Sequence, residues 1–250
     1  ESVALPTVAT RFGTPCFVYS RAALETAYRE FDAALAGRDH LICYAMKANS
    51  NLAILDVFAK LGSGFDIVSG GELARALAAG ADPGRIVFSG VGKSEAEIRA
   101  ALTTGILCFN VESAAELARV ARVAEDLKTR APVSLRVNPD VDPRTHPYIS
   151  TGLKETKFGV AYADALGLYG DASASPHLDV AGLDFHIGSQ LTEIAPFVDA
   201  LGRVLDLVDA LDREGIRLRH LDIGGGLGIR YQAEQPPAVA DYLHAMMARI

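Results

Sequence analysis

Short apolar runs alternate with longer amphipathic segments along most of the chain. The first amphipathic segment, residues 21–36, has apolar residues at helical spacing, with Ser20 before it as an N-cap and Gly37 after it as a stop, and predicts a helix. Seven apolar runs of strand length follow, each ahead of a helical segment, at residues 41–44, 64–68, 85–89, 107–111, 133–138, 182–187 and 218–223. This order predicts a parallel α/β fold.

Several of the later helices carry further signals in the sequence. Ser94 with Glu97, and Ser113 with Glu116, have the spacing of a capping box, which predicts a helix start at each serine. Apolar residues recur at helical spacing over residues 193–213, which predicts a long helix with one buried face.

The predicted strands are nearly all apolar, which indicates burial on both faces and fits either a closed barrel or an open doubly wound sheet. Seven strand-helix units and a last helical run over residues 242–250 favour a (β/α)8 TIM barrel. That count is one strand short, and the last run reaches Ile250 without a terminating signal. We therefore expect a fragment, with an extended segment over residues 1–20 and an incomplete barrel domain over residues 21–250.

Composition and charge narrow the classes of function. A chain of 250 residues that is 50% hydrophobic can bury one substantial core, while a net charge of -7 with scattered Lys and Arg argues against a nucleic-acid surface. No apolar run has the length of a membrane span, and the first residues lack the pattern of a secretory signal, so we expect a cytoplasmic protein. Cys16, Cys43 and Cys108 are odd in number and far apart, which predicts reduced core thiols with neither disulfide nor metal site. A small-molecule site is the expectation that remains.

Lys47 directly follows the first predicted strand. The carboxyl ends of parallel strands meet at one side of the fold, where ligands bind. A lysine held in such a pocket loses hydration, its neutral amine becomes easier to reach, and it can form a Schiff base with an aldehyde. The alternative is a solvated lysine at a strand end, which the surrounding sequence has to exclude.

Polar and small residues follow the sixth and seventh predicted strands. Gly224, Gly225 and Gly226 can present backbone N–H groups as an anion nest, which predicts a phosphate site, although a tight turn is the simpler alternative. His186 offers a flat ring for stacking on a planar cofactor, and Ser189 can donate to a phosphate oxygen. A histidine satisfied within the core is the other interpretation of His186.

Two charged residues lie inside apolar strands. Burying Asp66 or Arg136 alone is costly, so we expect them to pair with each other or with a cofactor or substrate. The other interpretation of these two charges is a purely structural ion pair. The long irregular stretch over residues 139–157, directly after the fifth strand, predicts a lid or binding element.

These motifs together resemble a known family. The segments are Tyr-Ala-Met-Lys-Ala-Asn-Ser-Asn at Lys47, Gly-Phe-Asp at Asp66, Leu-Arg-Val-Asn-Pro at Arg136, His-Ile-Gly-Ser-Gln-Leu at His186 and Asp-Ile-Gly-Gly-Gly-Leu-Gly at Gly224. In this order they resemble the motifs of the pyridoxal-phosphate decarboxylases of alanine-racemase fold, fold type III, over nearly the whole chain. Residues 146–159 are similar to a loop of the diaminopimelate decarboxylases.

The resemblance implies a cofactor, a reaction and a set of roles. Lys47 would hold pyridoxal 5'-phosphate as a Schiff base, His186 would stack on its ring, and Asp66 and Arg136 would lie near it. The phosphate would be bound by Ser189, Gly224, Gly225 and Gly226. The implied reaction is decarboxylation of meso-2,6-diaminopimelate to L-lysine and carbon dioxide, in a homodimer with shared active sites.

The sequence also departs from the family pattern. The family's eighth strand, with Glu-Pro-Gly-Arg, and its C-terminal β domain do not occur by Ile250. We therefore expect residues 1–250 alone to bind the cofactor weakly and not to turn over. The alternatives are an ornithine or arginine decarboxylase, an amino-acid racemase, a non-catalytic single-domain protein that binds the same cofactor, and an α/β scaffold without catalysis. A racemase lysine is usually followed by Ala-Asn-Ala-Tyr-Gly, whereas Ala-Asn-Ser-Asn follows Lys47.

Overall fold

The computed structural model describes residues 1–141 and 158–250 of the chain. Most of the predicted binding element over residues 139–157, and most of the loop over residues 146–159, lie outside the described residues.

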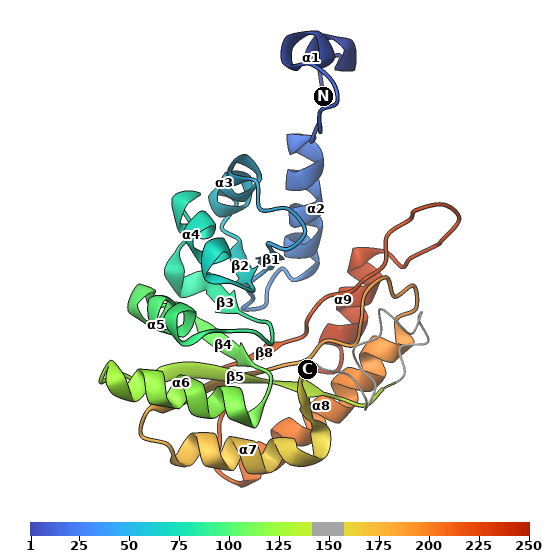
Figure 1. Ribbon diagram of the computed structural model, residues 1–250. Coiled ribbons are helices and arrows are strands. Elements are labelled where there is room, and N and C mark those ends of the chain that lie inside the picture. Colours follow the sequence, from blue (N-terminus) through green and yellow to red (C-terminus); the bar gives the residue numbers. More distant parts are fainter. Residues whose placement is uncertain (142–157) are drawn as a thin grey trace.

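The described residues form one parallel sheet at the centre of the molecule (Figure 1). Its strands run in the order β1 (Cys43–Ala45), β2 (Gly64–Ile67), β3 (Ile86–Phe88), β4 (Cys108–Val111), β5 (Ala131–Asn138), β7 (Leu178–Asp184) and β8 (His220–Asp222), with β6 (Val160–Ala161) paired to β5. Neighbours in this order are also neighbours along the chain, as in a barrel. All seven predicted strands are confirmed. The two-residue β6 was not predicted.

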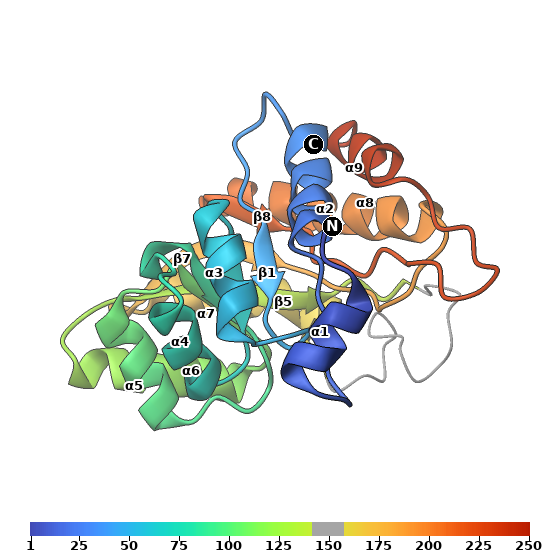
Figure 2. The same ribbon diagram turned by 90° about the horizontal axis from the view of Figure 1, so that it is seen from above.

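Helices surround the sheet on its outer side: α2 (Arg21–Ala34), α3 (Leu52–Lys60), α4 (Gly70–Ala78), α5 (Glu95–Thr104), α6 (Ala114–Asp126), α7 (Tyr162–Ala174), α8 (Ala195–Arg213) and α9 (Val239–Met247). A short 3-10 turn over Pro83–Arg85 precedes β3. Helices α2 and α9, from opposite ends of the chain, pack against each other (Figure 2). Nη2 of Arg38 also donates to the carbonyl oxygen of Met247 at 2.9 Å. The parallel strands and surrounding helices confirm the barrel-type α/β fold.

The sheet itself is curled but open. Strands β1 and β8 are its two edges, and within the described residues no strand pairs with their outer sides. The helical layer is thus continuous from α9 to α2, whereas the strand ladder beneath it has a seam.

Predicted helix caps are observed, with one instructive difference. The side chain of Ser20 accepts from the N–H of Ala23, and Ser94 with Glu97 forms a complete capping box. Ser113 accepts from the N–H of Glu116, but the carboxylate of Glu116 binds Lys93 rather than returning to the cap. The second capping box is therefore only half formed.

The extended N-terminal segment is wrong over Leu5–Phe12, which form helix α1. A proline lies in its first turn, where the missing N–H costs nothing, but the N-cap Ala4 offers no side-chain hydrogen bond. Helix α1 buries none of its residues and stands away from the other helices (Figure 1). Without a cap or a buried face, the sequence carries little signal for this helix.

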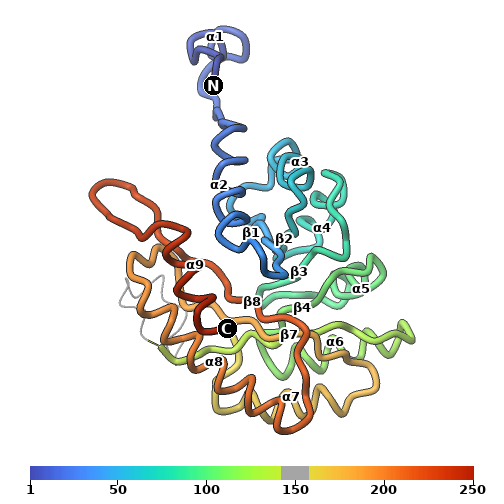
Figure 3. Tube along the Cα trace, turned by 180° about the vertical axis from the view of Figure 1, so that it is seen from behind, coloured from blue at the N-terminus to red at the C-terminus, as the bar shows by residue number. Residues whose placement is uncertain are grey.

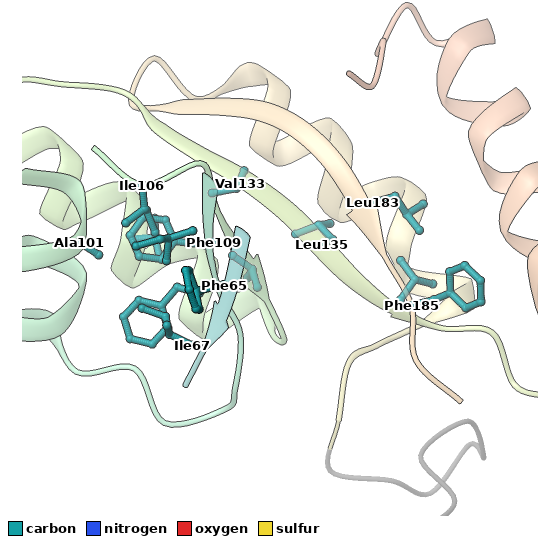
Figure 4. Close-up of a cluster of buried hydrophobic side chains, with 14 of the residues drawn as sticks. Phe65, Ile67, Ala101, Ile106, Phe109, Val133, Leu135, Leu183 and Phe185 are labelled. Atoms are coloured by element: carbon teal, nitrogen blue, oxygen red, sulfur yellow. The ribbon is translucent and has the colours of Figure 1, made fainter. Parts of the chain in front are cut away.

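The main core lies between the outer face of the sheet and the helices. Phe65, Ile67 and Phe109 point outward from β2 and β4, and Ala101 of α5 lies beside them (Figure 4). Residues between these positions point inward because successive side chains of a strand alternate in direction. Some inward residues near the carboxyl ends, such as Asp66 and Asn110, are polar, yet the central strands are almost wholly buried, so the predicted burial on both faces is confirmed.

Deeper inside the curl, small side chains fill the space. A second apolar cluster contains Val87, Cys108 and Ala181, with Cys43 packed against it. The Sγ atom of Cys108 lies 3.7 Å from Nε2 of His220. A Cβ atom at Gly182 would overlap the imidazole of His220.

The predicted core location holds for two of the three cysteines. All three cysteines are free; Cys108 is buried and Cys43 is partly buried, but Cys16 is exposed and is not a core residue. It lies in the segment after α1, where Phe17 is 91% exposed. In the described ranges, none of the helices is both long enough and apolar enough to span a bilayer.

Candidate functional site

Polar side chains from distant strands meet inside the curl near the carboxyl ends of the strands. Nδ2 of Asn110, on β4, donates to Oγ of Ser89 at 3.2 Å and to Oδ2 of Asp222 at 3.3 Å. Strands β5 and β7 separate β4 from β8 in the sheet, so the bond to Asp222 crosses the interior. The inward positions of Asp66 and Arg136 belong to the same polar interior.

Lys47 lies just beyond β1, beside the carboxyl end of β2. The N–H of the preceding Met46 donates to the carbonyl oxygen of Asp66 at 3.0 Å. The ammonium of Lys47 is close enough to lower the pKa of both Asp66 and His186. Lys47 is exposed in the part of the chain that the structure describes, so its amine does not lose hydration there as predicted.

Asp66 places a carboxyl group at a buried position, where its charged form is unfavourable. Burial is the largest cause that raises its pKa to about 6, and the neighbouring Asp222 carboxylate adds to the shift, while Lys47 and Arg136 oppose it. Its Oδ1 atom is buried and has no hydrogen-bond partner among the described residues. An acceptor left without a donor favours the neutral carboxyl group, in agreement with the raised pKa, although with a pKa of about 6 the group is still mostly ionised at pH 7.

Arg136 pairs with residues other than the expected Asp66. Its Nη1 atom lies 3.2 Å from Oε1 of Glu112, and its Nε atom lies 3.9 Å from Oδ2 of Asp184. The guanidinium carbon also lies 5.0 Å from the ring centre of Phe158. The contact with Glu112 is the shorter of the two, and both of its side chains are largely buried, so Glu112 is the main partner of Arg136.

Glu112 joins three segments of the chain. Besides Arg136, its carboxylate accepts from the N–H of Gly90 at 3.0 Å and from the N–H of Gly159 at 3.1 Å. Glu112 is 4% exposed, and three donors satisfy it. It therefore fixes the position of Arg136 relative to the segments after β3 and before β6.

The ring of His186 is set at the junction of two strand ends. Its Nδ1 atom accepts from the N–H of Gly225 at 3.4 Å. Burial is the largest cause that lowers the pKa of His186 to about 3, with Arg136 and Lys47 adding to the shift. The imidazole is therefore neutral at physiological pH and offers a flat aromatic face rather than a charge. Ser189, three residues on, is exposed.

The three glycines after β8 are not equivalent. Gly224 and Gly226 have φ values of +65° and +105°, and a Cβ atom on them would overlap the carbonyl oxygens of Phe185 and Gly188, respectively. A Cβ atom at Gly225 would meet no atom within 4 Å among the described residues. The turn itself requires two of the glycines, whereas no contact within the described fold requires the third.

The loops that follow β7 and β8 are held to each other. The N–H of Leu191 donates to the carbonyl oxygen of Gly226 at 2.9 Å, and the N–H of Gly228 donates to the carbonyl oxygen of Leu191 at 2.8 Å. The amide of Gln190 binds both backbone groups of Ile229. Beyond this junction the chain loops outward before α9 (Figure 3). His186 and the glycine loop thus form one unit.

The structure brings Lys47, Asp66, Arg136, His186 and the glycine loop to the same end of the sheet. Sequence reasoning missed the partners that hold them: Ser89, Asn110, Glu112, Asp184 and Asp222. A signal was present in the strands, because a polar residue between two outward apolar ones marks an inward position, as in Phe109-Asn110-Val111 and Leu221-Asp222-Ile223. No role was predicted from the sequence for Asp184 or Asp222.

A second buried charge pair supports the site from outside. The ammonium of Lys93 is 2.7 Å from Oε1 of Glu116, and it also donates to the carbonyl oxygens of Gly90 and Asn110. Oε2 of Glu116 accepts from the N–H of Glu112. Three acceptors satisfy the ammonium, and the pair connects α6 to the ends of β3 and β4.

Comparisons with known proteins agree with this geometry. The family model described as pyridoxal-dependent decarboxylase, pyridoxal binding domain, matches residues 21–250. The chain is 60% identical over 250 residues to the diaminopimelate decarboxylase of Pseudomonas aeruginosa and 56% identical to that of Vibrio cholerae. These matches cover 100% of the chain and 60% of each relative, so the chain spans about three fifths of their length.

Solved structures show the same similarity. A diaminopimelate decarboxylase from Helicobacter pylori, complexed with L-lysine, has a TM-score of 0.92 at 45% identity, covering 96% of this chain and 62% of that one. A lysine decarboxylase from Selenomonas ruminantium has a TM-score of 0.86 at 28% identity, covering 98% and 61%. The match over residues 21–250 and the identity to these relatives establish that the chain belongs to the pyridoxal-dependent decarboxylases, as their pyridoxal-binding domain.

Proposed function

We propose that the protein is a pyridoxal-phosphate-dependent decarboxylase that converts meso-2,6-diaminopimelate to L-lysine and carbon dioxide. The observation that carries this proposal is the identity of 60% over the whole chain to a relative named diaminopimelate decarboxylase. The related structure from Helicobacter pylori is complexed with L-lysine, which is the product of the proposed reaction.

The described residues fit the cofactor. Gly225 leaves open space at the glycine loop, which lets a phosphate approach the backbone, and the neutral ring of His186 lies against this loop. The N–H groups of Gly224 and Gly225 already donate to Asp222 and His186 and hold the loop in shape. Lys47 is the amine that would hold the aldehyde, and Ser189 is an exposed hydroxyl on the adjoining loop. When bound, pyridoxal phosphate supplies an electron sink for the electrons released as carbon dioxide leaves.

The protein's own groups then have distinct tasks. Neutral His186 offers an aromatic face without adding a positive charge beside Lys47 and Arg136. Arg136, held by Glu112 and Asp184, supplies a fixed positive charge to the interior. Asp66, with a pKa of about 6, can hold a proton near Lys47. Together these groups orient the substrate and set the local proton balance.

The cofactor assignment is tested by borohydride reduction of the full-length protein with pyridoxal phosphate, followed by peptide mapping. We expect a pyridoxyl adduct on Lys47 and none after Lys47→Ala. An unmodified Lys47 in the intact protein would contradict the proposed role and favour a scaffold without this cofactor.

The substrate is tested separately by product analysis with diaminopimelate, ornithine, arginine and lysine. We expect L-lysine and carbon dioxide from diaminopimelate, with at least tenfold lower kcat/KM for the others. A preference for ornithine or arginine would overturn the substrate proposal while leaving the cofactor proposal intact. No turnover of any of them, with a pyridoxyl adduct present, would favour the non-catalytic alternative.

A homodimer with shared active sites and a cytoplasmic location belong to the same proposal. The free thiols of Cys16, Cys43 and Cys108 support a reducing compartment. Light scattering of the full-length protein should give twice the chain mass. Cell fractionation should place the protein with cytoplasmic markers.

A further inference from the structure

We propose that Asn110 is a positioning residue, which holds the glycine loop Gly224–Gly226 in shape from the opposite side of the curled sheet by way of Asp222. The inference deepens the proposed function and rests on it, because the loop's ligand would be the cofactor phosphate.

The first step is the contact across the interior. Asn110 is 2% exposed, and its Nδ2 atom donates to Oδ2 of Asp222 at 3.3 Å. The same amide nitrogen donates to Oγ of Ser89 at 3.2 Å, and Oδ1 faces the Sγ atom of Cys108 at 3.8 Å. Both ends of the amide therefore have partners, which sets the direction in which the N–H groups point.

The second step leads from Asp222 to the loop. Oδ1 of Asp222 accepts from the N–H of Gly224 at 2.9 Å. An aspartate that binds the N–H two residues on forms an Asx turn, which favours a turn at the intervening residue. One carboxylate oxygen thus holds the glycine loop while the other is held by Asn110. Rotation of the carboxylate would weaken both bonds together.

The third step concerns charge. Asp66 and Asp184 lie near Asp222, and the pKa of each is raised, by burial first and by Asp222 next among the charges. A neutral amide donor orients Asp222 without competing with Arg136 for these carboxylates. An aspartate at residue 110 would add another carboxylate and remove the donor.

The fourth step concerns rigidity. The carbonyl oxygen of Asn110 accepts from the buried ammonium of Lys93 at 2.8 Å. The backbone of Asn110 is therefore fixed by α6 and the end of β3, outside the sheet, while its side chain acts on β8 inside it. A residue anchored in this way can transmit the position of β4 to the glycine loop.

The test is Asn110→Ala in the full-length protein, with two measurements. Loss of one net hydrogen bond should raise the Kd for pyridoxal phosphate about 3- to 10-fold. Absorbance and fluorescence titration measure this Kd. Amide hydrogen exchange at Gly224–Gly228, measured without cofactor, should become faster by a similar factor. Asn110→Asp, which has the same shape, should raise the Kd further, and it carries the test if Asn110→Ala does not fold.

Ser134→Ala is the matched control, because Oγ of Ser134 is buried in the same interior and has no hydrogen-bond partner among the described residues. It should leave both measurements within twofold. Unchanged exchange in the Asn110 variants would overturn the inference, even with a raised Kd. A wild-type protein that takes up no pyridoxal phosphate would instead overturn the proposed function, and loop exchange alone would then decide the role of Asn110.

Discussion

Single residues in this site are distinguished by what surrounds them rather than by their type. Gly225 and Gly226 are adjacent glycines, yet only Gly226 has a positive φ and a backbone neighbour where a Cβ would be. Asp66 and Asp179 are both strand aspartates. The first has a raised pKa because it is buried, and the second has a lowered pKa because Arg219 binds it.

The difference between the two glycines gives a direct test of the phosphate nest. Gly226→Ala should destabilise the protein by at least about 1 to 2 kcal/mol, because alanine is strained at this φ and would overlap Gly188. Gly225→Ala should change the free energy of unfolding by less than about 0.5 kcal/mol. It should nevertheless raise the Kd for pyridoxal phosphate about tenfold, because a methyl group would keep the phosphate from the backbone. Urea unfolding and cofactor titration provide the two values, and normal cofactor binding by Gly225→Ala would contradict the nest.

Asp66 should make stability depend on pH. Its pKa is about 6 in the folded chain and 3.8 as the reference for the unfolded chain, so the folded state binds the proton more tightly. Its contribution to stability is therefore complete below pH 3.8 and is lost as the pH rises through about 6. Asp66→Asn in the apo protein should remove about 1.4 kcal/mol of this dependence between pH 5 and pH 8. The free energy of unfolding, measured at pH 5 and pH 8, gives this dependence. The same change with pH in the wild type and in Asp66→Asn would contradict the raised pKa.

At the scale of elements, the joints between strands and helices depend on a few buried charges. Lys93 connects the ends of β3 and β4 to α6 through Glu116, and all of its ammonium hydrogens have acceptors. Glu112 then connects the end of β4 to Arg136 on β5. These two links position the interior of the site from the helical layer.

Lys93→Met should destabilise the full-length protein by about 3 to 5 kcal/mol, because it leaves the buried carboxylate of Glu116 without its cation. The matched control is Lys60→Met, which removes an exposed pair with Asp56 on α3 and should cost less than about 0.5 kcal/mol. Equal midpoints and slopes in urea for the two variants would show that the buried pair adds no stability.

The elements were predictable from the sequence where the signal was local. Alternation of apolar runs and amphipathic segments predicted all seven strands of the central order, and Ser20 and Ser94 predicted their helix starts. Helix α1 was missed because it has neither a capping side chain nor a buried face. The capping box predicted at Ser113 is only half formed, because the carboxylate of Glu116 binds Lys93, which lies 20 residues before Ser113 in the sequence.

The site was less predictable, because its geometry depends on contacts between distant strands. The glycine run, His186 and Lys47 were identified by type and by position at strand ends. The predicted pairing of Arg136 with Asp66 was wrong, since sequence alone does not distinguish Asp66 from Glu112 without the register of β2, β4 and β5. Its alternative, a contact of either residue with a cofactor or substrate, stays a prediction. Asn110 was missed because its role depends on the curvature of the sheet, which brings Asp222 within reach.

At the scale of the whole molecule, the main feature is the open seam of the sheet, since no strand among the described residues pairs with the outer side of β1 or β8. Lys47 follows one of these strands and the glycine loop follows the other, so the two halves of the candidate cofactor site lie on either side of the seam. Backbone groups left unpaired at sheet edges favour association with other chains.

Residues 1–250 prepared alone should therefore bind pyridoxal phosphate at least tenfold more weakly than the full-length protein and should release no carbon dioxide from diaminopimelate. Calorimetric titration and a carbon dioxide assay measure these values, with light scattering to record association. Full activity from residues 1–250 would contradict the expectation that the site needs more than this domain.

The imidazole of His220 occupies the space that a side chain at Gly182 would need, and this contact between β7 and β8 has a consequence for the history of the family. A larger residue cannot replace Gly182 while His220 keeps its ring in this place. Relatives with a larger residue in place of Gly182 should carry a small residue in place of His220, so the two positions should vary together when many sequences are aligned. Independent variation would mean that neighbouring strands can separate enough to hold both side chains.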